Sequence, residues 1–158
     1  MSQPKLDLID WAILRALQAD GRITNVELAK QVGLSAPPCL RRVRALEKAG
    51  FIRGYHAAVD EKQLGFAVTV FAMVGLNSQH EADLAAFEAH VRQHPAVREC
   101  YMLNGEVDFI LKCVSKDLDE FQDFLTSALT PAPHVASVKT SFVIRQSKRQ
   151  SDVPLEHV

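Results

Sequence analysis

Three cations in the first third of the chain, Arg41, Arg44 and Lys48, recur at the spacing of one face of an α-helix. At roughly 100° per residue, these three residues and Pro37 fall within about 60° of one another. The apolar residues of the same segment gather on nearly the opposite side. A cationic face that begins near a helix N-terminus, which itself favours phosphate, has the chemistry needed in a DNA major groove. An ordinary amphipathic helix with a basic, solvated face has the same pattern.

The candidate DNA-binding residues are polar, basic and turn positions of this segment and of the helix expected before it. They are Asn25, Ser35, Pro37, Arg41, Arg42, Arg44 and Lys48. Arg42 lies at the margin of the apolar face. We expect it to contact either a phosphate or an acidic partner inside the domain.

The charges of the chain are divided unequally along its length. Residues 1–54 carry nine basic and five acidic side chains, a net charge of +4, whereas the remaining 104 residues carry −5. A basic first third followed by an acidic remainder indicates two functions in one chain. The basic part could bind nucleic acid. This asymmetry and the cationic helix face together favour DNA binding over a merely solvated face.

Composition and motifs argue against several other classes of protein. With 158 residues, 47% of them hydrophobic, the chain can bury a core in one medium or two small domains. Three well-separated cysteines give neither a disulfide framework nor a zinc site, and His90 with His94 reads as a solvated helix face.

No catalytic motif is present, so we expect no catalytic residue, metal or cofactor. With neither a signal peptide nor a membrane-length apolar run, the expected compartment is the cytoplasm.

Three short helices are expected to position the cationic face. Helical apolar periodicity predicts them at residues 7–19, 24–33 and 35–50. Thr24 and Glu27 form the pattern of a capping box, and a tight turn at residues 33–35 joins the last two helices. This is the arrangement of a helix-turn-helix. Residues 51–59 then read as a short extended excursion.

From Phe66 onward the pattern predicts a mixed sheet. The expected order is β-α-β-β-α-β, over residues 66–76, 81–93, 97–103, 107–114, 117–129 and 135–144. That order is the split βαβ, ferredoxin-like arrangement. Asn104-Gly105 is the strongest short signal for a hairpin. The polar tail after Arg145 is expected to fray.

Five stretches of sequence form a specific combination of motifs. They are L-D-x-x-D-x-x-I-L at 6–14, D-G-R-I-T-N-V-E-L-A at 20–29, V-G-L-S at 32–35, P-C-L-x-R-V-R-x-L-E-x-x-G-F-I at 38–52 and C-Y-M-L-N-G-E-V-D at 100–108. Through them the chain resembles the leucine-responsive regulatory protein/AsnC family of transcriptional regulators over essentially residues 6–150.

This resemblance implies an α+β protein with two functional domains. An N-terminal winged helix-turn-helix would bind DNA, and a C-terminal ferredoxin-like βαββαβ domain would sense amino acids. The expected boundaries are residues 1–60 for the first domain, 61–65 for a linker, 66–145 for the second domain and 146–158 for a tail. The resemblance also implies homodimers formed by the sensing domains, which associate into octamers or similar rings. An apolar first strand agrees with dimerisation through the sheets.

The resemblance places the effector at an interface between dimers, near the turn between the second and third strands of the sensing domain. The candidate effector-binding residues are Leu103, Asn104, Gly105, Val107, Asp108, Thr140 and Ser141. Gly105, expected at a positive φ, would admit a ligand carboxylate to a backbone N–H, and Asp108 could accept from the ammonium. Asn104-Gly105 could equally be only a hairpin turn, with Asp108 as its polar flank.

The chemistry of these candidates indicates the class of effector. Val107 offers an apolar wall, and Thr140 and Ser141 add hydroxyls. No nearby arginine points to an acidic ligand, so a neutral amino acid with an aliphatic or sulfur-containing side chain is favoured. His134 stands where many members of the family have glycine before the final strand. This difference puts the geometry of the loop before that strand in doubt.

The sequence therefore predicts a one-component regulator in which an amino acid changes assembly or DNA binding. Two alternatives stay open at this point. One is an architectural protein that wraps double-stranded DNA without responding to small molecules. The other is an amino-acid-binding regulatory subunit of an enzyme, against which the cationic face argues.

Overall fold

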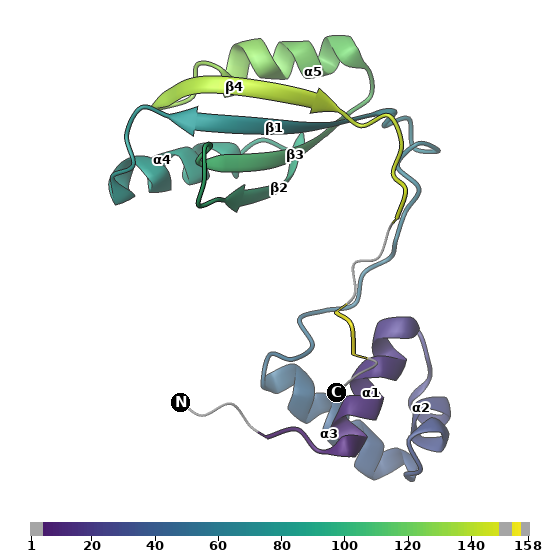
Figure 1. Cartoon of the computed structure of the whole chain (residues 1–158). Helices are drawn as coiled ribbons and strands as arrows, with labels where there is room; N and C mark the ends of the chain where they lie inside the picture. Colours follow the sequence, from purple (N-terminus) through teal and green to yellow (C-terminus); the bar gives the residue numbers. More distant parts are fainter. Residues whose placement is uncertain (1–4, 149–152, 156–158) are drawn as a thin grey trace. The chain divides into compact units, whose positions relative to one another are not determined.

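The computed structural model describes residues 5–148 and 153–155 and divides into two compact units (Figure 1). The first unit contains the residues up to Ala58 together with Val153–Leu155, and the second runs from Val59 to Lys148. The division thus falls two residues before the expected end of the DNA-binding domain. Residues 61–65, expected as a linker, form a turn within the second unit, where Gly65 N donates to Lys62 O at 3.0 Å. Of the expected tail, residues 149–152 and 156–158 lie outside the described residues.

Three helices make up the first unit, as the periodicity predicts. They are α1 (Leu8–Ala19), α2 (Asn25–Gln31) and α3 (Ala36–Lys48). Thr24 and Glu27 form the expected capping box at the start of α2. Asp7 caps α1 in the same reciprocal way, because Asp10 N donates to the Asp7 carboxylate at 2.8 Å. These caps satisfy backbone N–H groups that have no partner inside the helix.

The helices of this unit pack through one small apolar core. Ile13 of α1, Leu28 of α2 and Cys39, Val43 and Leu46 of α3 are all buried. Between α2 and α3 the chain turns at Gly33, whose φ of +71° favours glycine because it has no Cβ. Residues 52–60 continue as extended chain without strand pairing in the described residues.

The second unit has the expected β-α-β-β-α-β order. Its elements are β1 (Val68–Leu76), α4 (Glu81–Val91), β2 (Val97–Met102), β3 (Phe109–Ser115), α5 (Leu118–Phe124) with a π-helical continuation (Leu125–Leu129), and β4 (Val135–Phe142). The strands lie in the order β2-β3-β1-β4, and each neighbouring pair is antiparallel. This is the ferredoxin-like arrangement that the sequence predicts.

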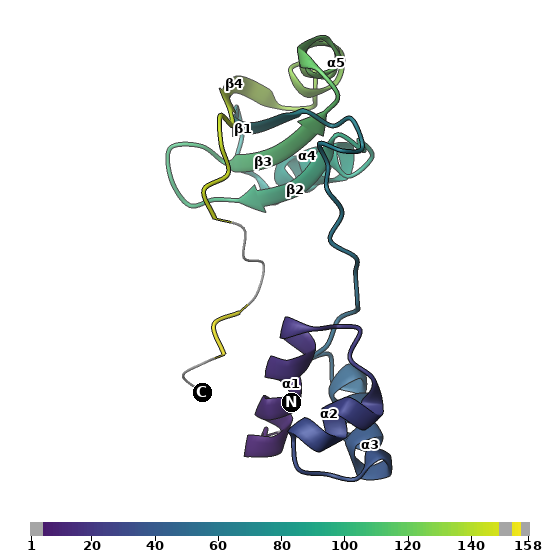
Figure 2. The same ribbon diagram turned by 90° about the vertical axis from the view of Figure 1, so that its right-hand side faces the viewer.

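One face of the sheet carries both helices (Figure 2). Alternate residues of β1 and β3, including Val74, Phe109 and Leu111, are buried against Phe87 of α4 and Phe121 of α5. The Phe87 and Phe109 rings lie 4.8 Å apart between centroids. The register puts the intervening residues on the opposite face, which α4 and α5 leave uncovered.

The hairpin predicted at Asn104-Gly105 is confirmed, because β2 and β3 are antiparallel neighbours joined through these residues, but its loop is longer than predicted. Strand pairing ends at Met102 and Phe109, and the six residues between them form a longer loop. Leu103 N donates to Asp108 O at 2.8 Å and closes this loop at its base. Asp108 N in turn donates to Val74 O of β1 at 3.0 Å. Asp108 therefore lies beside β1 just before β3 begins, rather than in a two-residue turn.

Candidate nucleic-acid interface and ligand site

The sequence of α3 sets both where the helix begins and which side it buries. Ser35 stands at the N-cap, and prolines occupy the first turn, where a missing N–H costs no helix hydrogen bond. Cys39, Val43 and Leu46 are then buried against the other two helices. The remaining side of α3 is therefore fixed as its outer face.

Arg41, Arg44 and Lys48 lie on that outer face and are all exposed. No salt bridge or side-chain hydrogen bond within the described residues engages any of the three. Ser35 and Pro37 are exposed at the start of the same helix, and the Ser35 hydroxyl makes no capping hydrogen bond. Six of the seven DNA-binding candidates thus lie on α3 or at its N-cap. Three of them, Arg41, Arg44 and Lys48, have no partner in the described chain.

Arg42 is placed differently from its neighbours. Its guanidinium Nη1 donates to Asp7 Oδ2 at 2.8 Å and to Asp10 Oδ1 at 2.7 Å. The two hydrogen-bonded carboxylates raise the pKa of Arg42, while hydrogen bonds from the Asp10 backbone and then from Arg42 lower the pKa of Asp7. Of the two roles expected for Arg42, the intradomain acidic partner is the one with a contact in the structure. The side chain joins α3 to the beginning of α1.

Asn25 also makes a contact inside the unit. Its side-chain Nδ2 donates to Ala36 O at 2.8 Å, which joins the start of α2 to the start of α3. Its Oδ1 is buried and has no hydrogen-bond partner in the described chain. A buried acceptor without a partner is uncommon and marks this position for explanation.

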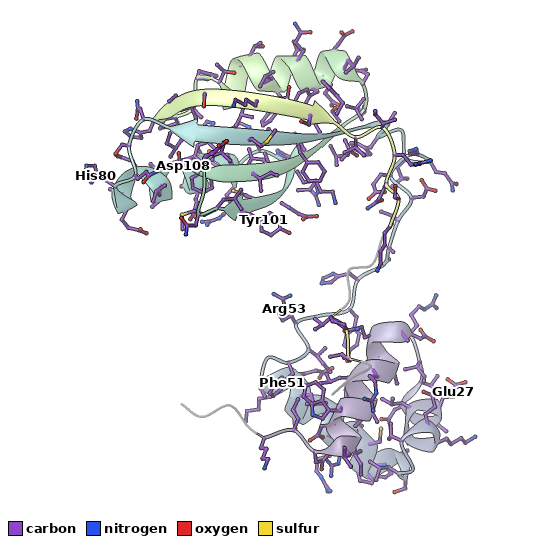
Figure 3. The ribbon with its side chains drawn as sticks, viewed as in Figure 1. Glu27, Phe51, Arg53, His80, Tyr101 and Asp108 are labelled. Carbon is purple, nitrogen blue, oxygen red and sulfur yellow. The ribbon has the colours of Figure 1, made fainter. Side chains whose placement is uncertain are left out.

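The second candidate site is a small recess at the end of the sheet that carries Asp108. It measures about 190 Å³ and is lined by Gln79, Leu84, Met102, Leu103, Asn104, Gly105 and Asp108. Asp108 Oδ2 accepts from Leu76 N at 2.6 Å, and Oδ1 accepts from Gln79 Nε2 at 3.0 Å. Figure 3 shows Asp108 at the end of the unit where the loop with His80 also lies. The carboxylate is thus held in place by β1 and by the loop that leads into α4.

Four of the seven effector candidates line this recess: Leu103, Asn104, Gly105 and Asp108. Val107 is partly buried next to Asp108 but does not line it. Sequence reasoning missed Gln79, Leu84 and Met102. No local motif identifies Gln79, because its role follows only from the hydrogen bond to Asp108 across 29 positions of sequence.

Thr140 and Ser141 are not brought to this recess within one chain. They pair with Ala72 and Phe71 of β1, whereas the recess lies beyond the level of Val74. Strand β1 also separates β4 from β3, so about 10 Å of sheet lies between them at the usual strand spacing. The two hydroxyls therefore belong to a different part of the sheet from Gly105.

The positive φ expected at Gly105 is wrong. The glycines with φ in the left-handed region are Gly33, Gly50, Gly54 and Gly65. A Cβ built at Gly105 would meet no atom within 4 Å. By contrast, His134 does have a left-handed φ of +64°, and its imidazole Nε2 lies 3.2 Å from Asp83 Oδ1. The loop before β4 therefore keeps a glycine-like backbone while carrying a histidine.

Models of two protein families match this chain. A winged helix-turn-helix DNA-binding domain matches residues 6–53, and the Lrp/AsnC ligand binding domain matches residues 69–153. The chain belongs to the Lrp/AsnC family. It is a transcriptional regulator with a helix-turn-helix DNA-binding domain and an amino-acid-binding domain, and the resemblance seen in its motifs is confirmed.

Relatives and solved structures extend over nearly the whole chain. A leucine-responsive regulatory protein of Rhizobium meliloti is 53% identical over 151 residues, which cover 96% of this chain and 97% of the relative. A Bkd operon transcriptional regulator of Pseudomonas aeruginosa is 44% identical and covers 96% of this chain and 99% of the relative. A regulator–L-Met complex from Neisseria meningitidis has a TM-score of 0.91 at 36% identity, covering 97% and 99% of the two chains.

Other kinds of site are scarce in the described part of the chain. No group of three or more His, Cys, Asp or Glu side chains there could hold a metal ion. No described helix is long and apolar enough to cross a membrane. Burial raises the pKa of Cys113 to about 12, which keeps that thiol protonated.

Proposed function

We propose that α3 contacts operator DNA through Arg41, Arg44 and Lys48, with Ser35 and Pro37 at the start of the helix near the phosphates. The observation that carries this proposal is the set of three exposed cations without partners in the described chain, opposite the buried side of the same helix. Lys and Arg side chains in this position supply phosphate contacts or donors for base edges. Arg42 and Asn25 support this interface indirectly, because each ties α3 to another helix.

The test is a mobility-shift assay on a DNA fragment selected from a random library by the wild-type protein. A variant with alanine at Arg41, Arg44 and Lys48 is expected to bind this fragment more weakly while its far-ultraviolet circular dichroism stays unchanged. Full binding by this folded variant would overturn the assignment of the helix.

We also propose that the uncovered face of the sheet pairs with a second copy of the chain. The register places Phe71 and Met73 of β1, Ile110 of β3 and Tyr101 of β2 on this face. Phe71 is 37% exposed and Tyr101 is 53% exposed, although both are large apolar side chains. An exposed apolar patch of this kind is ordinarily covered by a partner, and the family resemblance favours a homodimer that assembles further into an octamer. Light scattering at micromolar concentration tests this, and a monomer would contradict it.

The recess at Asp108 is the proposed effector site. Asp108 offers carboxylate lone pairs to an ammonium group, Gly105 leaves open space beside the backbone, and Leu84, Met102 and Leu103 supply apolar surface. These groups suit a neutral amino acid with an aliphatic or sulfur-containing side chain. The L-Met complex named for the Neisseria meningitidis structure supports this class of ligand. Thr140 and Ser141 join such a site only if another copy contributes them.

A thermal-shift screen of the twenty amino acids tests this proposal, since a ligand that binds only the folded state raises its apparent stability. Any amino acid that raises the melting temperature is then titrated into the DNA-binding assay. A change in DNA affinity supports the effector role. Unchanged DNA affinity at a saturating concentration favours the alternative of an architectural protein that ignores small molecules.

A further inference from the structure

The first unit contains an apolar groove that no residue of α3 lines. The groove runs between α1 and the extended chain after α3, and its lining includes Trp11, Leu14, Leu17, Phe51 and Tyr55. Its volume is about 660 Å³, and its lining is mainly apolar. We call this hollow the tail groove, because two residues from the far end of the chain, Val153 and Leu155, complete its lining.

The C-terminal segment Val153–Leu155 is held on α1 through its backbone. Gln18 Nε2 donates to Val153 O at 2.6 Å, and Arg15 Nη1 donates to Leu155 O at 3.4 Å. Both donors stand on α1, about one helical turn apart, and they meet two carbonyls of the segment that Pro154 separates. Figure 1 shows the yellow segment beside α1. Pro154 favours extended backbone for the residue before it, which suits this way of binding.

The two apolar side chains of the segment are not equivalent. Val153 is 63% exposed, whereas Leu155 is partly buried in the lining of the tail groove. Leu155 is therefore the anchor, and Val153 contributes mainly its carbonyl oxygen. This difference within one short segment supplies a matched pair of positions for a test.

We propose that Val153–Leu155 is a docked strap of the DNA-binding unit, bound in the tail groove of its own chain. The chain leaves the first unit after Ala58 and re-enters it beyond Lys148, so the sensing unit is an insertion attached at both of its ends. A movement of the segment that follows β4 can therefore be passed along the chain to the strap and so to α1, without involving residues 59–67. The strap is a contact of the regulator with itself.

Trp11 makes the test direct, because it is the only tryptophan of the chain and lines the tail groove. Leu155→Ser in the full-length protein is expected to shift Trp11 emission to longer wavelength and to increase its quenching by acrylamide. Val153→Ser is the matched control and is expected to leave both close to wild type. Gln18→Ala, which removes the hydrogen bond to Val153 O, is expected to give a smaller shift in the same direction as Leu155→Ser. Identical emission and quenching in wild type and Leu155→Ser would overturn the proposal.

A second measurement asks which copy of the chain fills the groove. A protein truncated after Lys148, which retains Trp11 but lacks the strap, is mixed with full-length Trp11→Phe protein and left to exchange subunits. With a strap bound in its own chain, the emission of the truncated protein stays red-shifted in the mixture. Recovery of the wild-type emission would show that a second copy supplies the strap and would overturn the same-chain assignment.

Discussion

Arg42 of α3 places its guanidinium Nη1 2.7 Å from Asp10 Oδ1 of α1, next to the residues proposed to bind DNA. The same nitrogen also donates to the Asp7 carboxylate at 2.8 Å. One arginine thus forms salt bridges with both acidic side chains at the start of α1. Arg41 precedes it directly and has no such partner in the described chain. Two adjacent arginines thus have different roles, one inside the unit and one on its surface.

Replacing Arg42 is therefore expected to affect folding before it affects DNA contact. Arg42→Ala should lower the melting temperature of the first unit by a few degrees, because two carboxylates lose a shared hydrogen-bond donor. Arg41→Ala should leave that temperature close to wild type. Thermal unfolding followed by Trp11 fluorescence measures both, and equal stability of the two variants would contradict the assignment of Arg42.

Acid is expected to weaken the first unit through its helix caps. The Asp10 N–H lowers the pKa of Asp7, and hydrogen bonds from Thr24 lower the pKa of Glu27. A carboxyl group whose pKa is lower in the folded state stabilises that state at every pH above the ordinary pKa of the group. The ordinary pKa is 3.8 for Asp7 and 4.5 for Glu27. The contribution is lost as the pH falls through the lowered folded value. Melting curves of wild type and Asp7→Asn between about pH 6 and pH 3 should therefore converge as the pH falls. A constant difference would contradict this linkage.

The effector site is tested by calorimetry with the amino acid that the thermal-shift screen selects. Asp108→Asn should weaken binding, because a neutral amide attracts an ammonium less than a carboxylate does. Gly105→Ala should fold normally, since its Cβ meets open space, and should weaken binding only if the ligand approaches that backbone. Glu106→Gln, in the same loop but outside the lining of the recess, is the control. Unchanged affinity in both folded test variants would place the site elsewhere.

The core of the second unit is expected to be sensitive at Phe87. This side chain is fully buried and its ring lies 4.8 Å from that of Phe109 between centroids. Phe87→Ala should cost about 3–5 kcal/mol of unfolding free energy, as is usual for a buried phenylalanine that leaves a cavity. Chemical denaturation measures the loss. Leu118→Ala is a suitable control because Leu118 is 57% exposed, and a loss as large as that of Phe87→Ala would contradict this view of the core.

Much of this fold could be predicted from sequence because its signals are local. The capping box at Thr24 and Glu27, the apolar spacing along α3 and the alternation along β3 each act within a few residues. The loop between β2 and β3 could not be predicted in this way. Asn104-Gly105 favours a tight turn locally, whereas Asp108 is hydrogen-bonded to Val74 and Leu76 of β1, more than 30 positions earlier in the sequence.

The site residues show the same limit. Helical spacing identified the exposed Arg41, Arg44 and Lys48 and put Arg42 at the margin, yet only the packing of α1 selects between its two expected roles. Gln79 and the C-terminal segment were missed because their interactions join residues far apart in sequence. The tail was expected to fray, whereas Val153–Leu155 binds α1.

The salt dependence of DNA binding tests the central claim most directly. The logarithm of the association constant is measured against the logarithm of salt concentration for wild type and for the triple alanine variant at Arg41, Arg44 and Lys48. A second triple alanine variant at Lys62, Lys116 and Lys148, exposed lysines of the sensing unit, removes the same charge and serves as control. The slope is negative, and its magnitude should decrease by about 0.9 for each DNA phosphate that the α3 side chains no longer neutralise. In the control variant the slope should stay unchanged. A triple α3 variant that binds the selected DNA with wild-type affinity and slope would contradict the account.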